Sequence, residues 1–212
     1  MSFSVIILAA GKGSRMNSKT PKVFHKVGNL PMISHVLNLS ASLKPKIVTM
    51  VVSQELESHK EIIKKTYKSI KFATQAKQLG TADAVKCALG EKSFKNSDIS
   101  MILYGDTPLI SNFTLKKSLE KFKKMNLDLC ILSMTPPNTD HSYGRLIVKN
   151  DRIEKIIEKS EIKNSQQVEN LCNTGIMIIK TKYLGEKLKK IKNENKKREF
   201  FLTDIVEIFN HK

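Results

Sequence analysis

Apolar and polar residues alternate along the first part of the chain in blocks that predict alternating strands and helices. The most apolar block, residues 3–9, has almost no polar positions and is followed closely by Gly11, which is typical of a strand buried in a parallel sheet. Similar short runs predict further strands at residues 47–52, 70–74, 99–104 and 127–134. Apolar residues at helical spacing predict helices at residues 32–43, 55–67, 81–89 and 115–125. This alternation predicts an α/β fold with a Rossmann-like, doubly wound sheet.

The pattern changes after about residue 135, where two consecutive prolines interrupt the chain. Residues 145–148 and 152–157 predict a hairpin, because Asn150 and Asp151 between them are typical turn residues. The remaining elements predicted are a strand, a solvated, charged helix with a loop, and a closing helix, at residues 173–179, 182–198 and 200–209. We therefore expect one domain, residues 1–212, in which a smaller α+β part extends the same sheet.

The composition is that of a single folded domain without disulfide bonds or a membrane segment. With 212 residues, of which 40% are hydrophobic, the chain can bury one sizeable core. Its three cysteines are widely separated and form no C-x-x-C pair, so neither a zinc site nor a disulfide framework is indicated. The apolar run at residues 5–10 is too short for a membrane span or a signal peptide. We therefore expect a cytoplasmic protein with no membrane partner.

The net charge of +17, from 37 Lys and Arg against 20 Asp and Glu, raises the question of nucleic-acid binding. The lysines are spread over the whole chain, there is no Trp, and basic residues do not interleave with aromatic ones as they do in single-strand binders. We therefore expect no nucleic-acid partner. The positive charge is suited instead to attracting anionic small-molecule substrates.

The strongest chemical signal is the run L-A-A-G-K-G-S-R-M at residues 8–16, followed by Pro21 and Lys22. It places a glycine-containing loop at the carboxyl end of a buried strand, where open α/β sheets bind ligands. Backbone N–H groups of such a loop can point at phosphate oxygens, and Arg15 and Lys22 can neutralise a triphosphate. Met16 stands where a dinucleotide-binding fingerprint has its third glycine, and no G-K-[ST] closes the loop as in a Walker A site. The alternative is an ordinary glycine-rich turn with incidental basic residues.

Two further segments follow predicted strands and carry groups suited to the same chemistry. Asp106, in the run Y-G-D-T-P-L at residues 104–109, places a carboxylate where it can hold Mg²⁺. Gln75, in the run Q-A-K-Q-L-G-T at residues 75–81, carries the donor and acceptor groups that a pyrimidine edge requires. Each could instead be structural, because Gly-Asp and Thr-Pro are common turn pairs and Thr81 suits a helix N-terminus. Since parallel strands end on one side of a sheet, we expect the three segments to converge.

These motifs and four later ones resemble, in their order, one known family. The later motifs are Y-G-R, I-I-E, N-T-G and F-L-T-D, at residues 143–145, 156–158, 173–175 and 201–204. The set is similar to the uridyltransferase half of the bacterial bifunctional N-acetylglucosamine-1-phosphate uridyltransferase/glucosamine-1-phosphate acetyltransferases, over essentially the whole chain. The first motif is shared by many nucleotidyltransferases, whereas the ordered set is specific. The resemblance implies a mixed sheet of the nucleotide-diphospho-sugar transferase type, in which residues 1–135 bind the nucleotide and residues 136–212 bind the sugar.

The resemblance also implies a reaction, in which UTP and N-acetylglucosamine 1-phosphate give UDP-N-acetylglucosamine and pyrophosphate with Mg²⁺ as cofactor. The product would serve peptidoglycan and lipopolysaccharide precursor synthesis. The implied catalytic residues are Arg15 and Lys22, and the implied metal ligand is Asp106. The nucleotide-binding residues implied are Leu8, Ala9, Ala10, Gly11, Lys22, Gln75, Gly80, Thr81, Tyr104, Gly105 and Asp106. The residues implied to contact the sugar are Gly144, Glu158 and Asn173.

The chain departs from the family pattern in two places. Ser160 stands where the family often has Lys, two residues after Glu158. In the family, a further strand and an Asn-bearing loop complete the metal site and a trimerising acetyltransferase domain follows. The given sequence ends at Lys212 before both, so we expect a nucleotidyltransferase domain truncated relative to the family: a lone domain, a truncated gene product or a fragment. Its oligomeric state stays open. The alternatives are transfer to another sugar phosphate, cytidylyl transfer, and nucleotide binding without turnover.

Overall fold

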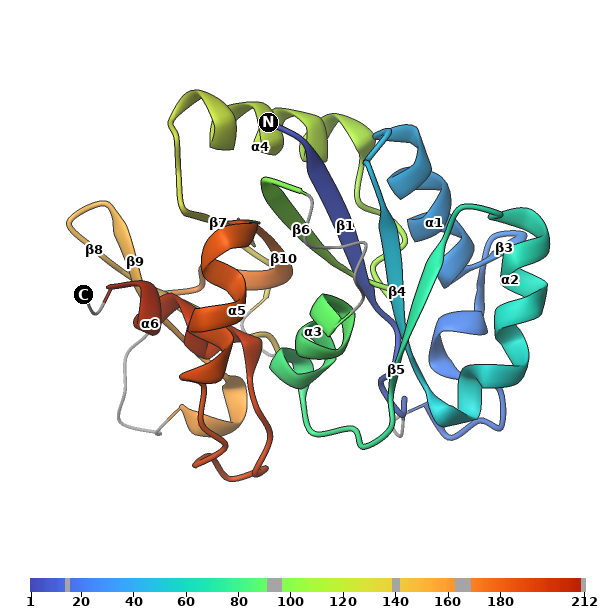
Figure 1. The fold of residues 1–212 in the computed structure, drawn as a ribbon. Coiled ribbons are helices and arrows are strands. Elements are labelled where there is room, and N and C mark those ends of the chain that lie inside the picture. The colour runs from blue at the N-terminus through green and yellow to red at the C-terminus, as the bar shows by residue number, and fades with distance from the viewer. Residues whose placement is uncertain (14–15, 91–96, 139–141, 163–168, 211–212) are drawn as a thin grey trace.

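The computed structural model describes residues 1–13, 16–90, 97–138, 142–162 and 169–210, which are built around one eight-stranded sheet (Figure 1). Four parallel strands form one half of this sheet, as the apolar runs predict. In spatial order they are β5 (Lys71–Gln75), β4 (Val48–Ser53), β1 (Phe3–Leu8) and β6 (Ile99–Tyr104). The register places Leu8 between Val51 and Tyr104, so these strands end at one common edge.

The rest of the chain adds an antiparallel part to the same sheet. The added strands are β7 (Leu129–Met134), β8 (Arg145–Lys149), β9 (Arg152–Ile157) and β10 (Cys172–Lys180). β10 runs antiparallel to β6, β7 and β8, and β8 and β9 form the predicted hairpin. Asn150 and Asp151 have φ angles of 50° and 58°, the left-handed geometry that a tight hairpin turn needs and that Asn and Asp tolerate. The mixed sheet is thereby confirmed.

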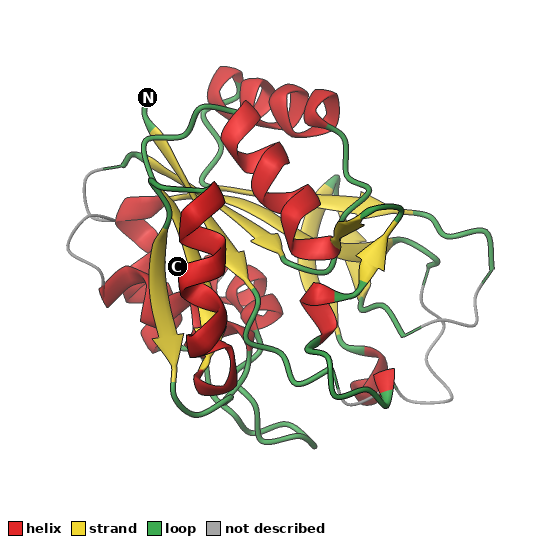
Figure 2. Ribbon diagram, turned by 90° about the vertical axis from the view of Figure 1, so that its right-hand side faces the viewer, coloured by secondary structure: helices red, strands yellow, loops and turns green. Residues whose placement is uncertain are grey.

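Helices cover both faces of the sheet (Figure 2). One face carries α1 (Met32–Ser42), α2 (Lys60–Thr66) and α4 (Asn112–Lys124), and the other carries α3 (Thr81–Gly90), α5 (Thr181–Lys189) and α6 (Ile205–Asn210). Alternate residues of β1 point into the two cores: Val5 and Ile7 into one, Ile6 and Leu8 into the other. This burial on both faces explains why the first strand is apolar at nearly every position.

Two helix predictions near the C-terminus were wrong. The closing helix predicted from residue 200 begins only at Ile205, because Phe201 is extended (φ −78°, ψ 126°) and η6 (Leu202–Asp204), a 3₁₀-helix, precedes α6. The helix predicted to be solvated begins at Thr181 and packs on the core through Leu184 and Leu188, which are fully buried. The segment was predicted to be solvated because most of its residues are charged. The apolar stripe that packs on the core contains only a few residues and was not recognised.

Two smaller differences lie near the site edge. The helix predicted at residues 55–67 is divided into η3 (Gln54–His59), a 3₁₀-helix, and α2. A short hairpin of β2 (Lys26–Val27) and β3 (Leu30–Pro31), preceded by η2 (Lys22–Phe24), was not predicted. Within the described ranges, no helix has the length and apolar character that crossing a membrane requires.

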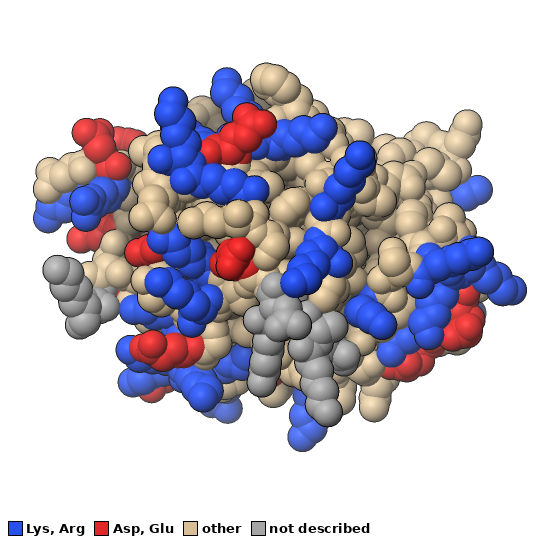
Figure 3. Space-filling view, turned by 45° about the horizontal axis from the view of Figure 1, so that its top comes forward, with Lys and Arg blue, Asp and Glu red and all other residues tan. Residues whose placement is uncertain are grey.

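The basic residues on the face drawn in Figure 3 do not form one patch. Figure 3 shows Lys and Arg side chains distributed across one face and interspersed with Asp and Glu. This distribution suits a general attraction of anions better than a single docking patch for a polyanion.

Candidate active site

Three loops meet at the carboxyl edge of the parallel strands, as the sequence predicts. The loop after β1 is tied to the loop after β6 by the N–H of Gly105, which donates to the Leu8 carbonyl at 2.9 Å. It is tied to the loop after β5 by Nε2 of Gln78, which donates to the Ala10 carbonyl at 2.5 Å. Gln78 was not among the predicted site residues, although it is the second glutamine of the Q-x-x-Q run. The glycine loop is thus held between the other two.

Small residues allow these loops to lie close together. A Cβ atom at Gly105 would lie 3.2 Å from the Cβ of Ala9, which leaves no spare room. The side chains of Leu8, Ala9 and Ala10 are buried, whereas Gly11 is exposed. A ligand at this edge would therefore meet the main chain of the first three residues and not their side chains.

Lys22 and Asp106 form an ion pair at the same edge, with 2.5 Å between Nζ and Oδ2. Their side chains are 35% and 26% exposed, so both groups can be reached from the solvent. The glycine loop lies against the lysine: Gly13 has a φ of 61°, and a Cβ there would lie 2.6 Å from the Cβ of Lys22. Arg15, the second cation of the prediction, lies outside the described residues.

Asp106 is suited to a divalent cation only with help from a substrate. In the described part of the chain, no group of three or more His, Cys, Asp or Glu side chains is placed to hold a metal ion. Mg²⁺ commonly binds one or two carboxylates together with substrate phosphates and water. The partly exposed Asp106 carboxylate, a hard oxygen donor beside a phosphate-type loop, fits that mode of binding.

Gln75 is turned into the protein. The side chain is only 3% exposed, and Nε2 donates to the Gly80 carbonyl at 3.0 Å and to Oδ2 of Asp83 at 2.7 Å. These bonds use both amide hydrogens, so only the side-chain carbonyl could serve a base. The structure thus gives Gln75 a clear part in shaping the loop, while its contact with a pyrimidine stays a prediction.

Tyr104 lies between the two predicted substrate sides. Its ring packs on Gly175, where the φ of 85° and a Cβ only 2.6 Å from the Tyr104 ring exclude a larger residue. Its hydroxyl hydrogen-bonds with Thr81. Burial, and then the negative charges of Glu158 and Asp106, raise the pKa of the Tyr104 phenol far above its ordinary value of 10. Tyr104 therefore stays neutral near pH 7, and its ring is held in place against Gly175.

The three residues predicted to contact a sugar come together beyond Tyr104. The N–H of Asn173 donates to the Gly144 carbonyl at 2.9 Å, and a Cβ at Gly144 would lie 3.5 Å from Oε2 of Glu158. The other carboxylate oxygen, Oε1, accepts a hydrogen bond from the hydroxyl of Thr203 at 2.9 Å. Thr203 belongs to the F-L-T-D run but was not among the predicted site residues.

Ser160, the departure from the family pattern, lies in the 3₁₀-helix η5 (Lys159–Glu161) after Glu158. Its carbonyl accepts a hydrogen bond from Nζ of Lys196 at 2.8 Å. The N–H of Lys196 also donates to Oε1 of Glu161 at 3.3 Å. A lysine from another segment is therefore placed beside the position where the family often has its own.

The Asp204 carboxyl makes the stability of the folded chain depend on pH. Burial raises its pKa from 3.8 to about 6, and the nearby carboxylates of Glu158, Glu207 and Glu161 add to the rise. Because the pKa of the folded state is the higher one, the folded chain holds more protons between about pH 4 and 6, and the free energy of unfolding falls as the pH rises through this window.

Asp204→Asn is therefore expected to raise the free energy of unfolding at pH 7.5 by about 1 kcal/mol, a value reduced for partial solvent screening. Near pH 4, where the wild-type carboxyl is protonated in the folded state, the variant should differ little from the wild type. Urea denaturation at the two pH values measures both differences. An equal effect at both pH values would show that the charge on Asp204 is not the cause.

The molecule is thus an α/β protein whose glycine loop and Lys22–Asp106 ion pair lie together at the carboxyl edge of its parallel strands. The chain belongs to the nucleotidyl transferase family, whose model matches residues 4–212. It is 36% identical to the bifunctional protein GlmU of Buchnera aphidicola subsp. Baizongia pistaciae, 39% to that of Wolbachia pipientis wMel and 40% to that of Thermodesulfovibrio yellowstonii. These alignments cover 98%, 96% and 96% of this chain but only 45%, 45% and 44% of the relatives. The resemblance found in the motifs is thereby confirmed, and the chain spans less than half the length of these curated relatives.

Two solved structures share the fold. A UDP-glucose pyrophosphorylase complexed with UDP-glucose superposes with a TM-score of 0.78 at 16% identity, over 99% of this chain and 87% of that chain. A putative glucose-1-phosphate thymidylyltransferase from Bacillus anthracis in complex with a sucrose superposes with a TM-score of 0.76 at 21% identity, over 96% and 81%. The predicted nucleotide-diphospho-sugar transferase fold is confirmed.

Proposed function

We propose that this chain transfers a uridylyl group from UTP to N-acetylglucosamine 1-phosphate, releasing pyrophosphate and UDP-N-acetylglucosamine. The observation that carries the proposal is the position of Tyr104. The negative charges of Glu158 and of Asp106, which pairs with Lys22, both raise the pKa of its phenol, so both carboxylates lie near this side chain. The edge predicted to bind phosphate and the residues predicted to contact a sugar are thus both close to a single side chain. The choice of this sugar and this nucleotide comes from the motif resemblance, and the relatives named GlmU support that resemblance.

The proposed step is a direct displacement at phosphorus. An oxygen of the sugar phosphate, anionic at pH 7, forms a bond to the α-phosphorus of UTP. The bond from that phosphorus to the α,β-bridging oxygen breaks, and pyrophosphate leaves with the bridging oxygen and its electron pair. No proton has to be removed from the attacking group, so the site needs no general base. Lys22 and Arg15 would neutralise the triphosphate, and the loops would hold the reacting atoms in line.

We propose that Asp106 holds Mg²⁺ together with phosphate oxygens of the substrate. When bound, the ion would neutralise charge that develops on the phosphates. The Lys22 ammonium now paired with Asp106 would then contact a phosphate. The reaction would supply precursors of peptidoglycan and lipopolysaccharide in the cytoplasm, and we propose no nucleic-acid partner.

The test is a pyrophosphate-release assay on the purified chain with UTP, Mg²⁺ and N-acetylglucosamine 1-phosphate. We expect release that depends on all three, and a Lys22→Ala variant sets the background. In separate reactions, CTP or dTTP replaces UTP. In others, glucose 1-phosphate or glucosamine 1-phosphate replaces N-acetylglucosamine 1-phosphate. A higher kcat/KM with another pair would reassign the substrates, whereas UTP binding without release above the Lys22→Ala background would leave a nucleotide-binding domain and overturn the proposal.

A further inference from the structure

The segment from Phe200 to Thr203 joins the two sides of the site. Phe200 is hydrogen-bonded through its main chain to the loop after β5: its N–H donates to the Leu79 carbonyl at 2.8 Å and its carbonyl accepts the N–H of Ala82 at 2.9 Å. Figure 1 shows this C-terminal segment beside the loop that leads into α3. The contact requires Gly80, because a Cβ there would lie 2.5 Å from the Phe200 carbonyl oxygen. The segment is therefore hydrogen-bonded to, and closely packed against, the loop predicted to bind the base.

The next residues of this segment form hydrogen bonds first to the nucleotide side of the site and then to the sugar side. The N–H of Leu202 donates to Oγ1 of Thr81 at 2.9 Å, and Thr81 also hydrogen-bonds with Tyr104. The hydroxyl of Thr203 donates to Oε1 of Glu158 at 2.9 Å. One turn of the 3₁₀-helix η6 thus connects the nucleotide loop to the carboxylate on the sugar side.

The bond from Thr203 is suited to fixing the orientation of Glu158. Thr203 is only 4% exposed and sits in a regular turn, so its hydroxyl has little freedom to move. A carboxylate can only accept hydrogen bonds, and a donor on one oxygen restrains rotation of the whole group. The second oxygen, Oε2, is directed towards Gly144, where the predicted sugar contacts lie. Glu158 is thereby left with one anchored oxygen and one that faces the site.

We propose that Thr203 is a positioning residue, which holds Glu158 so that its second oxygen can accept hydrogen bonds from sugar hydroxyls. This inference rests on the proposed function in that it assigns a sugar nucleotide to the site. A purely structural reading is that the bond only fastens η6 to the end of β9. The two readings differ in whether loss of the hydroxyl changes recognition of the sugar.

The experiment measures, by calorimetry, how much more tightly each variant binds UDP-N-acetylglucosamine than UDP. This ratio isolates the sugar side, because the nucleotide contacts are common to both ligands. In the wild type the ratio should exceed one. Thr203→Val keeps the shape but lacks the hydroxyl, and we expect it to lower the ratio about tenfold while leaving UDP binding unchanged. Thr203→Ser keeps a hydroxyl and should recover most of the ratio.

Two further variants separate positioning from stability. Thr181→Val removes another threonine hydroxyl, one that bonds Ser100 at 2.8 Å far from the site, and should leave the ratio unchanged at a similar melting temperature. In a Glu158→Ala background there is no carboxylate to position, so Thr203→Val should have no additional effect on the ratio. An equal loss in that background would show that Thr203 does not act through Glu158.

Besides that equal loss, two further results would overturn the inference. One is a wild type that binds both ligands equally, and the other is a Thr203→Val variant with an unchanged ratio while Glu158→Ala lowers it. Neither result depends on turnover. Pyrophosphate release by the wild type, measured separately, therefore tells whether the proposed function has failed as well.

Discussion

A Lys22→Ala variant is expected to have a kcat for pyrophosphate release about 10²–10³-fold below that of the wild type. The Lys22 ammonium lies 2.5 Å from the Asp106 carboxylate, beside the loop that we propose binds the triphosphate. Charge on the departing phosphates is greatest in the transition state, so loss of this cation should lower kcat more than it raises KM for UTP. Initial rates over a range of UTP concentrations measure the two constants.

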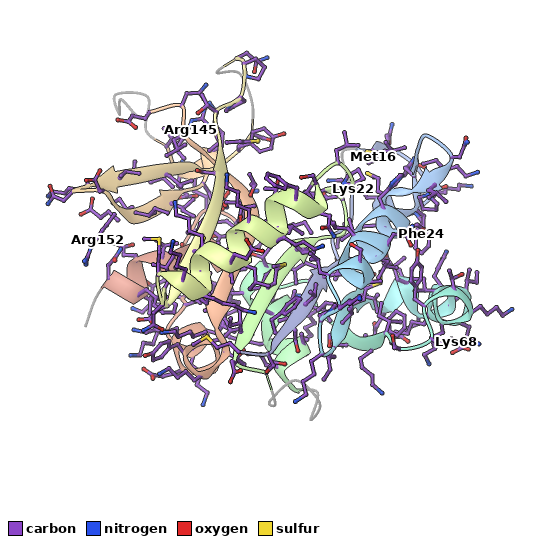
Figure 4. All side chains as sticks on the ribbon, turned by 90° about the horizontal axis from the view of Figure 1, so that it is seen from above. Met16, Lys22, Phe24, Lys68, Arg145 and Arg152 are labelled. Atoms are coloured by element: carbon purple, nitrogen blue, oxygen red, sulfur yellow. The ribbon has the colours of Figure 1, made fainter. Side chains whose placement is uncertain are left out.

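Two other variants control for charge and geometry. Lys68→Ala also removes one positive charge, but from an exposed lysine that Figure 4 shows well away from Lys22, and it should keep the wild-type rate. Lys22→Arg should recover only part of the rate, because the planar guanidinium does not replace the compact ammonium that lies 2.5 Å from Asp106. A kcat for Lys22→Ala within about threefold of the wild type would exclude Lys22 from transition-state stabilisation.

Gly80→Ala is expected to lower the free energy of unfolding by about 3 kcal/mol, one of the larger effects a single methyl group can have. Gly80 has a φ of 117°, which L-residues rarely adopt, and a Cβ there would lie 2.5 and 2.7 Å from the carbonyl oxygen and nitrogen of Phe200. Main-chain atoms cannot rotate out of the way as a flexible side chain can. Relief of the clash would separate the segment at Phe200 from the loop, so recognition of the nucleotide should weaken as well.

Two other glycine variants separate the effect of backbone strain from that of the clash with Phe200. Gly28 has a φ of 62° but nothing within 4 Å of an added Cβ, so Gly28→Ala measures backbone strain without a clash, about 1 kcal/mol. Gly185 lies inside α5 with open space and no positive φ, so Gly185→Ala should stabilise the chain by about 0.5–1 kcal/mol. Denaturant unfolding of all three variants gives the comparison. A Gly80→Ala variant no less stable than Gly28→Ala would mean that the contact with Phe200 is dispensable.

The part of the site that the sequence predicted best is the set of loops that follow strand ends. Each of the runs around Gly11, Gln75 and Asp106 directly follows an apolar strand, and parallel strands end at one edge, so their convergence followed from topology alone. The directions of individual side chains did not follow. The amide of Gln75 donates to Gly80 and Asp83, which was not predicted, while its contact with a base stays a prediction. Which partner a polar side chain selects depends on atoms brought close by folding, and spacing along the chain does not specify them.

The sequence by itself determined the α/β class, the parallel strands, the hairpin at Asn150 and Asp151, and the loops that carry the chemistry. Each of these features depends on local periodicity or on the conformational preferences of a few adjacent residues. Only the tertiary structure decided that the segment at Phe200 stays extended, that Tyr104 packs on Gly175, and that Thr203 anchors Glu158 across a sequence separation of 45 residues. These contacts join parts of the chain far apart in sequence. Their energies come from close packing and hydrogen bonds that form only once the sheet has placed those parts side by side.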